Sequence, residues 1–153
     1  MVNDGRLSRL RSLAVGFHGA LDAHDFSGEE SNLKDFPMEC CHHACTLLTV
    51  FLCEQGFTDI QKRVGSRPDR PNGEHLWLVV DGAVVDITAY QFDDALDKAI
   101  VTKDSAWHTQ RAGKPSQIGS EGEPLEEYVK RVKPFYDGLC EELGAKALRI
   151  ISQ

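Results

Sequence analysis

The sequence has 153 residues, of which 41% are hydrophobic and 27% charged, a size and balance that predict one globular domain spanning residues 1–153. Its formal net charge of -7 argues against binding to nucleic acid or to an anionic membrane, because both attractions depend on basic clusters, and no apolar run approaches the roughly 18 residues of a membrane-spanning helix. Five cysteines, an odd number without a recognisable secretory signal, predict free thiols in the reducing cytoplasm.

The first predicted element is an amphipathic helix over residues 7–23. Its apolar residues recur with a spacing of three and four, which places them on one stripe facing a core. They are Leu7, Leu10, Leu13, Ala14, Phe17, Ala20 and Leu21. The polar stretch over residues 27–32 has neither helical nor strand periodicity, so we predict a connector there.

A second helix is predicted after Pro37, with Gly56 as its stop, since glycine adopts left-handed backbone easily. Cys40 and Cys41 fall in the first turn of this helix. Unpaired backbone N–H groups and the positive end of the helix dipole favour a thiolate at such a position. The apolar residues that repeat with helical spacing are Ala44, Leu47, Leu48, Phe51 and Leu52.

The central part of the chain predicts strands. Residues 60–64 predict a short strand, and residues 66–73, which contain two prolines and a glycine, predict a loop that borders the cleft of the site. Two β-rich runs over residues 75–80 and 83–88 are separated by the dipeptide Asp81-Gly82, which is typical of a type I′ turn. We therefore predict a β-hairpin.

A two-residue turn fixes which residues of this hairpin lie opposite one another. Counting outward from the turn, Trp77 lies opposite Asp86, and His75 lies opposite Thr88. Because side chains alternate between the two faces of a strand, His75 and Asp86 are diagonal neighbours on one face, roughly 7 to 8 Å apart at the backbone. We predict a hydrogen bond between the Asp86 carboxylate and the His75 imidazole.

The last third of the chain gives weaker signals. Residues 99–101 predict a short strand, and residues 112–123, which are rich in Gly, Ser and Pro, predict a loop. Pro124 suits the first turn of a helix that runs from Leu125 to about Leu143. Pro134 lies inside this helix and should kink it or split it.

Cys41, His75 and Asp86 supply the parts of a thiol catalytic site. Thiol catalysis needs a sulfur that forms a thiolate, an imidazole that exchanges its proton and a group that orients the imidazole. Cys40 and Cys41 are both candidates for the nucleophile, since helical phase does not separate them. The backbone N–H of Cys41 is a candidate oxyanion donor. Weaker candidates for substrate or oxyanion contacts are Gln91, Trp77 and His42.

The order of these residues carries a resemblance to a known family. Phe36-Pro37 precedes Cys41, His75-Leu76-Trp77 precedes the Asp81-Gly82 turn, and Val85-Asp86-Ile87-Thr88-Ala89 is followed by Gln91-Phe92. Over residues 36–92 the chain resembles bacterial proteins of the transglutaminase-like branch of the papain-like cysteine protease superfamily. In that branch the cysteine lies on a helix, the histidine on a strand and the aspartate on the next strand.

The resemblance implies a fold and an activity. The fold is α+β, papain-like or transglutaminase-like, with N-terminal and central helices packed on an antiparallel sheet that carries His75 and Asp86. The activity is a cofactor-free attack of Cys41 on an amide of a protein or peptide substrate, through a thioester. Peptide cleavage, glutamine deamidation and acyl transfer all fit the same residues, and the oligomeric state stays open.

Two other classes of protein fit part of the pattern. Five potential zinc ligands crowd into six positions, although structural zinc favours spaced pairs with a second pair downstream; they are Cys40, Cys41, His42, His43 and Cys45. A catalytically silent interaction domain of the same fold is the other alternative.

The remaining cysteines and histidines predict no chemistry. Cys45, Cys53 and Cys140 lie among apolar helix residues, so we predict thiols in the core or at its boundary. The sequence gives no partner for His18, His24 or His108, and we predict surface or helix-face positions for them.

Overall fold

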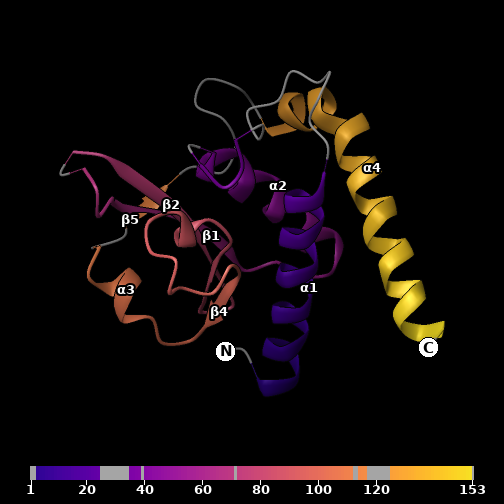
Figure 1. Ribbon diagram of the computed structural model, residues 1–153, viewed down its shortest axis with the longest axis horizontal. Helices are drawn as coiled ribbons and strands as arrows, with labels where there is room; N and C mark the ends of the chain where they lie inside the picture. Colours follow the sequence, from indigo (N-terminus) through magenta and orange to yellow (C-terminus); the bar gives the residue numbers. More distant parts are fainter. Residues whose placement is uncertain are drawn as a thin grey trace.

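The chain forms an α+β arrangement in which an antiparallel sheet packs against helices (Figure 1). The computed structural model describes residues 3–24, 35–38, 40–70, 72–111, 114–116 and 125–152. Its helices are α1 (Asp4–Ala23), α2 (Cys41–Glu54), the short 3-10 helix η1 (Ala89–Gln91), α3 (Ala106–Thr109) and α4 (Leu125–Ser152). Its strands are β1 (Ile60–Ser66), β2 (Glu74–Val80), β3 (Ala83–Asp86), β4 (Ile100–Thr102) and β5 (Lys114–Ser116).

The helix predicted over residues 7–23 is confirmed as α1, which begins three residues earlier. Asn3 precedes it as the N-cap, and its side-chain oxygen accepts the backbone N–H of Arg6 at 2.8 Å. This bond satisfies one of the N–H groups that have no partner within the helix. The apolar stripe faces the core as predicted, with Leu10, Phe17 and Leu21 fully buried. The predicted connector over residues 27–32 lies outside the described residues.

The second predicted helix is confirmed as α2, with Cys41 as its first residue. Cys40 is the N-cap, and its side chain makes no capping hydrogen bond. Gly56 follows the helix with a φ of 95°, which is the left-handed conformation that glycine adopts without strain. The helix thus starts without a side-chain cap and is followed by a glycine.

The predicted hairpin is confirmed, and so is its register for the three residue pairs next to the turn. Asp81 and Gly82 both have positive φ, 50° and 85°, as a type I′ turn requires. Leu78 lies opposite Val85, and the pairing continues to the turn in the predicted register. Because this register also decides which side chains share a face, it places His75 and Asp86 on the same side of the sheet.

The sheet has the strand order β4-β3-β2-β1-β5, and all its pairings are antiparallel. The strand predicted over residues 60–64 is confirmed as β1, and the one over 99–101 as β4, one residue later. The loop predicted over 112–123 is wrong for residues 114–116, which form β5 on the free edge of β1. A three-residue edge strand carries no alternating pattern, and Pro115 is tolerated because an outer strand leaves its N–H side unpaired. The rest of that stretch lies outside the described residues.

The predicted C-terminal helix is confirmed as α4, which runs on to Ser152. Pro134 lies inside it without splitting it, so of the two outcomes predicted from this proline the split is wrong. Figure 1 shows the first turns of α4 set at an angle to the rest of the helix. A proline removes one backbone hydrogen bond, which bends a helix whose other bonds hold it together.

The core lies between the helices and one face of the sheet. Helices α1 and α2 bury their apolar sides against that face, where Leu78, Val80 and Val85 are fully buried. Helix α4 packs on α1. The neighbouring residue Trp77 points to the other face, where it contacts His108 of α3. Within the described residues no helix combines the length and apolar character needed to cross a membrane.

Candidate active site

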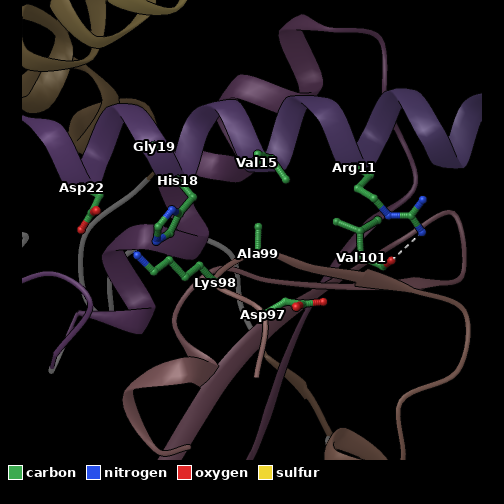
Figure 2. A pocket seen from close by; sticks show the side chains of 9 residues that line it. All are labelled: Arg11, Val15, His18, Gly19, Asp22, Asp97, Lys98, Ala99 and Val101. Carbon is green, nitrogen blue, oxygen red and sulfur yellow. Dashed lines mark hydrogen bonds between the residues drawn. The ribbon is translucent and has the colours of Figure 1, made fainter. Parts of the chain in front are cut away.

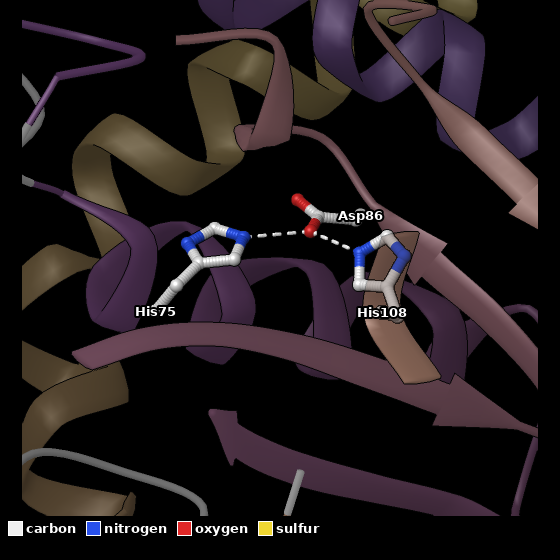
Figure 3. A group of neighbouring side chains, drawn as sticks. All are labelled: His75, Asp86 and His108. Atoms are coloured by element: carbon white, nitrogen blue, oxygen red, sulfur yellow. Dashed lines mark hydrogen bonds and ion pairs between the residues drawn. The ribbon is translucent and has the colours of Figure 1, made fainter. Parts of the chain in front are cut away.

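His75 and Asp86 form the hydrogen bond that the hairpin register predicts. His75 Nε2 lies 2.7 Å from Asp86 Oδ2, and both side chains are buried, with exposed fractions of 0% and 2%. Figure 3 shows the carboxylate between this imidazole and a second one, from His108. The strand start of β2 and the strand end of β3 thus hold a buried imidazole and a buried carboxylate in direct contact.

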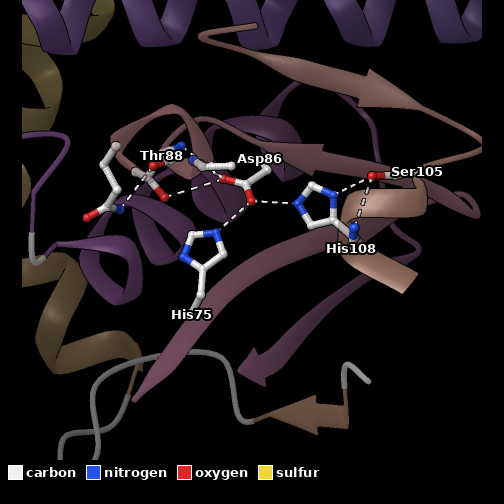
Figure 4. Close-up of polar contacts among 7 residues, drawn as sticks. His75, Asp86, Thr88, Ser105 and His108 are labelled. Carbon is white, nitrogen blue, oxygen red and sulfur yellow. Dashed lines mark hydrogen bonds and ion pairs between the residues drawn. The ribbon is translucent and has the colours of Figure 1, made fainter. Parts of the chain in front are cut away.

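The backbone just after β3 fixes the orientation of the Asp86 carboxylate. Its Oδ1 accepts the backbone N–H groups of Thr88 at 2.9 Å and Ala89 at 3.0 Å, and the Thr88 hydroxyl lies 3.3 Å away (Figure 4). An aspartate that bonds the N–H groups two and three residues ahead is typical of a turn that opens a helix, and η1 begins here. One oxygen is used by the turn, so the other faces the imidazoles.

His108 is a member of the site that the sequence did not predict. It lies on a helix, one of the two positions predicted for it, but it is buried and has a partner where the sequence indicates none. Its Nε2 lies 2.7 Å from Asp86 Oδ2, and its side chain is buried. It comes from the four-residue helix α3, whose N-cap is Ser105. A helix this short has no apolar periodicity to place its faces, and the pairing joins residues 22 positions apart. The only local signal is the N-cap serine three residues before the histidine.

Burial and partner charges have opposite effects on the pKa values of Asp86 and His75. Burial raises the pKa of Asp86, but the charge of His75 and the hydrogen bonds from His108 and His75 lower it by more, so the carboxylate stays ionised. Burial lowers the pKa of His75, but the charge and hydrogen bond of Asp86 and the Cys41 thiol raise it by more, to about 9. Partner charges and hydrogen bonds therefore outweigh desolvation at both groups.

Aromatic side chains surround the His75 ring. The ring centroids of Trp77, Phe92 and Trp107 lie 5.8, 5.1 and 5.7 Å from that of His75. Trp77 is buried and also contacts the His108 ring at 4.9 Å, in agreement with a shield over the hydrogen bonds of Asp86. Excluding water strengthens hydrogen bonds between charged groups. The loop at residues 66–73 reaches this cover, since the Arg67 guanidinium lies 5.0 Å over the Phe92 ring.

Cys41 lies at the first position of α2, is partly exposed and acts on the His75 ring. Its thiol raises the pKa of His75 through a side-chain contact and through charge. His75 Nδ1, the ring nitrogen on the side away from Asp86 (Figure 3), is buried and makes no hydrogen bond of ordinary geometry within the described part of the chain. Catalytic hydrogen bonds are often long or poorly aligned before substrate binds.

The other cysteines have different surroundings. Cys40 is buried at the N-cap, and burial raises the pKa of the Cys45 thiol well above its ordinary value. Cys140 is partly buried, as predicted for a boundary position. The prediction is wrong for Cys53, which is exposed because α2 ends at the next residue, beyond the edge of the core. Of the cysteines at the start of α2, Cys41 is the one that acts most strongly on His75.

The two other histidines with a predicted surface or helix-face position are His18 and His24. His18 lies on a face of α1 as predicted, but it is buried and has a partner, the Tyr90 hydroxyl, 2.8 Å from its Nε2. His24 is the C-cap residue of α1, and its ring lies 4.8 Å from that of Phe135. Neither of these contacts involves the candidate triad.

The weaker candidates Gln91 and His42 have other contacts. The Gln91 amide donates to the Thr88 carbonyl at 3.0 Å, so it braces the turn that holds Asp86. His42 Nδ1 lies 2.9 Å from the ammonium nitrogen of Lys62. Lys62 is itself buried, and the charges of Cys45 and Cys41 oppose the desolvation that lowers its pKa. A buried cation is therefore close enough to the thiols at the start of α2 to act on them.

The residues that could bind a metal ion in the structure differ from the zinc ligands that the sequence suggests at positions 40–45. Within the described residues, the ligand atoms that gather closely enough for a metal ion belong to His75, Asp86 and His108, which we call the His–Asp–His cluster; these atoms lie within 4.8 Å of one another. The Cys and His residues at positions 40–45 form no such group. Both imidazoles of the cluster approach the same carboxylate oxygen at 2.7 Å, which is hydrogen-bond geometry.

Among the described residues, two depressions lie apart from Cys41, His75 and Asp86. One of about 640 Å³ lies between α1 and residues 97–101 (Figure 2) and has charged side chains of both signs on its rim, among them Arg11, Asp22 and Lys98. A shallower one of about 190 Å³ lies over the outer face of the sheet, beside Trp77 and His108. Neither is lined by Cys41.

Comparisons with protein families, with characterised proteins and with solved structures gave no match. The structure itself shows an α+β arrangement in which a buried His–Asp–His cluster lies near a helix that begins with a cysteine.

Proposed function

We propose that this protein is a papain-like or transglutaminase-like cysteine hydrolase that acts on an amide bond through Cys41, His75 and Asp86. The observation that carries the proposal is the His75 imidazole, which is buried and bonded to Asp86 at 2.7 Å through one ring nitrogen. Its other nitrogen makes no ordinary hydrogen bond to the residues that the structure describes, and the Cys41 thiol acts on the same ring. A carboxylate, an oriented imidazole and a thiol in this order are the parts of a thiol catalytic site.

Each residue has a defined part in the proposed reaction. The Cys41 proton resides on His75 Nδ1, in keeping with the raised pKa of His75, and the thiolate of this ion pair attacks the amide carbonyl carbon. The tetrahedral intermediate collapses when His75 returns that proton to the leaving nitrogen, which departs as an amine or ammonia and leaves a thioester. A water molecule, deprotonated by His75, then attacks the thioester and restores the thiol. Asp86 holds the Nε2 proton and stabilises the imidazolium throughout.

The start of α2 supports the developing negative charge. The helix begins at Cys41 without a side-chain cap, so the backbone N–H of Cys41 is a suitable oxyanion donor at the positive end of the helix dipole. A protein or peptide is the proposed substrate. Because peptide bonds and glutamine side chains present the same reacting amide, peptidase and deamidase activities follow equally from these residues.

The first test measures thiol reactivity. Iodoacetamide labelling at neutral pH, followed cysteine by cysteine by mass spectrometry, should modify Cys41 faster than Cys53, the exposed thiol on the same helix. His75→Ala should slow labelling of Cys41 but leave that of Cys53 unchanged, because only Cys41 depends on the imidazole. Cys40→Ser is the matched control and should leave the Cys41 rate unchanged. Equal rates at Cys41 in the parent and His75→Ala proteins would contradict the proposal.

The second test identifies the reaction. Glutamine-containing peptides are incubated with the protein, and mass spectrometry distinguishes backbone cleavage from conversion of glutamine to glutamate. Adding a primary amine reports acyl transfer as a new amide product. All products should disappear in Cys41→Ala and persist in Cys40→Ser. Products that survive Cys41→Ala would assign the reaction to another residue.

A further inference from the structure

The Asp86 carboxylate is hydrogen-bonded to two imidazoles, whereas thiol catalysis needs one. Its Oδ1 is occupied by the backbone of the following turn, and its Oδ2 lies 2.7 Å from both His75 and His108 (Figure 3). A carboxylate oxygen has two lone-pair positions, so the two rings complete the coordination of Oδ2. Since the carboxylate is buried, loss of one donor would leave part of its charge unsatisfied.

Ser105 holds the His108 ring in the orientation that points Nε2 at Asp86. Ser105 Oγ accepts the backbone N–H of His108 at 3.3 Å and lies 2.5 Å from His108 Nδ1 (Figure 4). An ionised carboxylate can only accept, so His108 donates to Asp86 from Nε2. The other ring nitrogen, Nδ1, then accepts the Ser105 hydroxyl proton. Such a chain of oriented partners resembles the outer contacts that fix a histidine in other functional sites.

We propose that His108, oriented by Ser105, is a positioning residue that holds the Asp86 carboxylate in line with His75 and so aims the imidazole at the Cys41 thiol. This inference rests on the proposed function. His108 touches neither the thiol nor the carbonyl of a substrate; it acts through Asp86. Without its hydrogen bond, Oδ2 is free to rotate away from His75, because the turn holds only the other oxygen.

The geometry separates this role from simple packing. His108 also contacts Trp77 and Trp107, with ring centroids 4.9 and 4.8 Å away, so an apolar residue of similar size would preserve much of that packing. Only a side chain with an N–H donor at the position of Nε2 would preserve the bond to Asp86. Glutamine offers that donor, and leucine does not.

The test uses the iodoacetamide labelling rate of Cys41, with His75→Ala alongside. His108→Leu should slow labelling of Cys41 by roughly 10-fold or more, in the range found when an outer partner of a functional histidine is removed. His108→Gln should recover most of that loss. Ser105→Ala, which removes no ring, should slow labelling by a few-fold, since the His108 ring loses the hydrogen bond at Nδ1 that orients it. Cys53 serves as the internal reference.

An NMR measurement tests the positioning role without relying on the reactivity of Cys41. The proton on His75 Nε2 should give a distinct downfield NMR signal that weakens or shifts in His108→Leu and returns in His108→Gln. If His108→Leu, folded, matches the parent in both signal and labelling, the positioning role is wrong; it is equally wrong if His108→Gln is no better than His108→Leu. Should His108→Leu fail to fold, Ser105→Ala decides alone. If His75→Ala itself leaves Cys41 labelling unchanged, the proposed function fails instead, and the NMR signal still reports the positioning.

Discussion

Replacing Asp86 with asparagine should remove the pH dependence that His75 gives to stability. The change keeps the shape of the side chain but removes the charge that faces the His75 ring at 2.7 Å. Asp86 is the largest of the groups that raise the pKa of His75, and burial acts in the opposite direction. In Asp86→Asn the burial effect prevails, so the pKa of His75 should fall below its ordinary value of 6.5.

The size of the effect follows from the pKa of His75, which is raised from 6.5 to about 9. A group whose pKa is raised in the folded state stabilises the protein fully below the unfolded value, and this contribution is lost as the pH rises through the folded value. The window is therefore pH 6.5 to about 9, and the contribution is up to about 3 kcal/mol, at about 1.4 kcal/mol per pH unit. The side chain is fully buried, so solvent screening does not reduce it.

Urea unfolding across that pH window measures the effect, and an NMR titration of the His75 ring measures its pKa directly. The difference in unfolding free energy between the parent and Asp86→Asn should shrink as the pH rises from 6.5 to 9. Cys41→Ser is the control: it should keep most of the slope, because Asp86 affects His75 more than Cys41 does. A constant difference throughout the window, or a parent His75 that titrates near 6.5, would refute this electrostatic account.

Three further outcomes are expected. Gly65→Ala should lower the free energy of unfolding by about 1–3 kcal/mol, because a Cβ there would lie 2.5 Å from the Trp77 ring and 2.8 Å from a backbone oxygen. Gly138→Ala in α4 is the control: its Cβ would meet nothing within 4 Å, so it should raise the free energy of unfolding by about 0.5–1 kcal/mol. Equal effects of the two substitutions in urea unfolding would contradict the close packing at Gly65. Lys62→Met should slow iodoacetamide labelling of Cys41 several-fold, because the buried ammonium and the thiol attract each other; an unchanged rate would show that the charge is too distant to matter. Calorimetric titration with zinc should show no stoichiometric binding that depends on His108 at neutral pH, because each imidazole of the His–Asp–His cluster would first have to release its Nε2 proton. One ion per chain that binds to the parent but not to His108→Leu would overturn the hydrogen-bond interpretation.

The hairpin and the His75–Asp86 contact could be predicted because their causes are local. The Asp81-Gly82 dipeptide selects a two-residue turn, and the turn length alone decides which side chains of the two strands share a face. The same holds for the start of α2, which is placed by the apolar repeat that follows it. The class of the fold and two members of the candidate triad thus depend on residues that are neighbours in the sequence.

The missed elements are placed by contacts between distant segments. Residues 114–116 become β5 only because β1 offers an open edge, and the sequence of the strand itself, with its proline, predicts a loop. His108 reaches the site through a helix of four residues, too short for periodicity to show which face it buries. The apolar neighbours of Cys53 predict a position in the core or at its boundary, but the thiol is exposed because the helix ends one residue later.

Acceptor capacity gives a route to residues such as His108. An aspartate within the apolar run around Val84, Val85 and Ile87 needs a partner, because a buried charge without one is costly. A carboxylate, however, accepts at about four positions, and one imidazole fills one of them. The following turn fills the positions on Oδ1, so the cost of burial favours a second donor to Oδ2 beside His75. Among the histidines without a predicted role, His108 is the one that provides it.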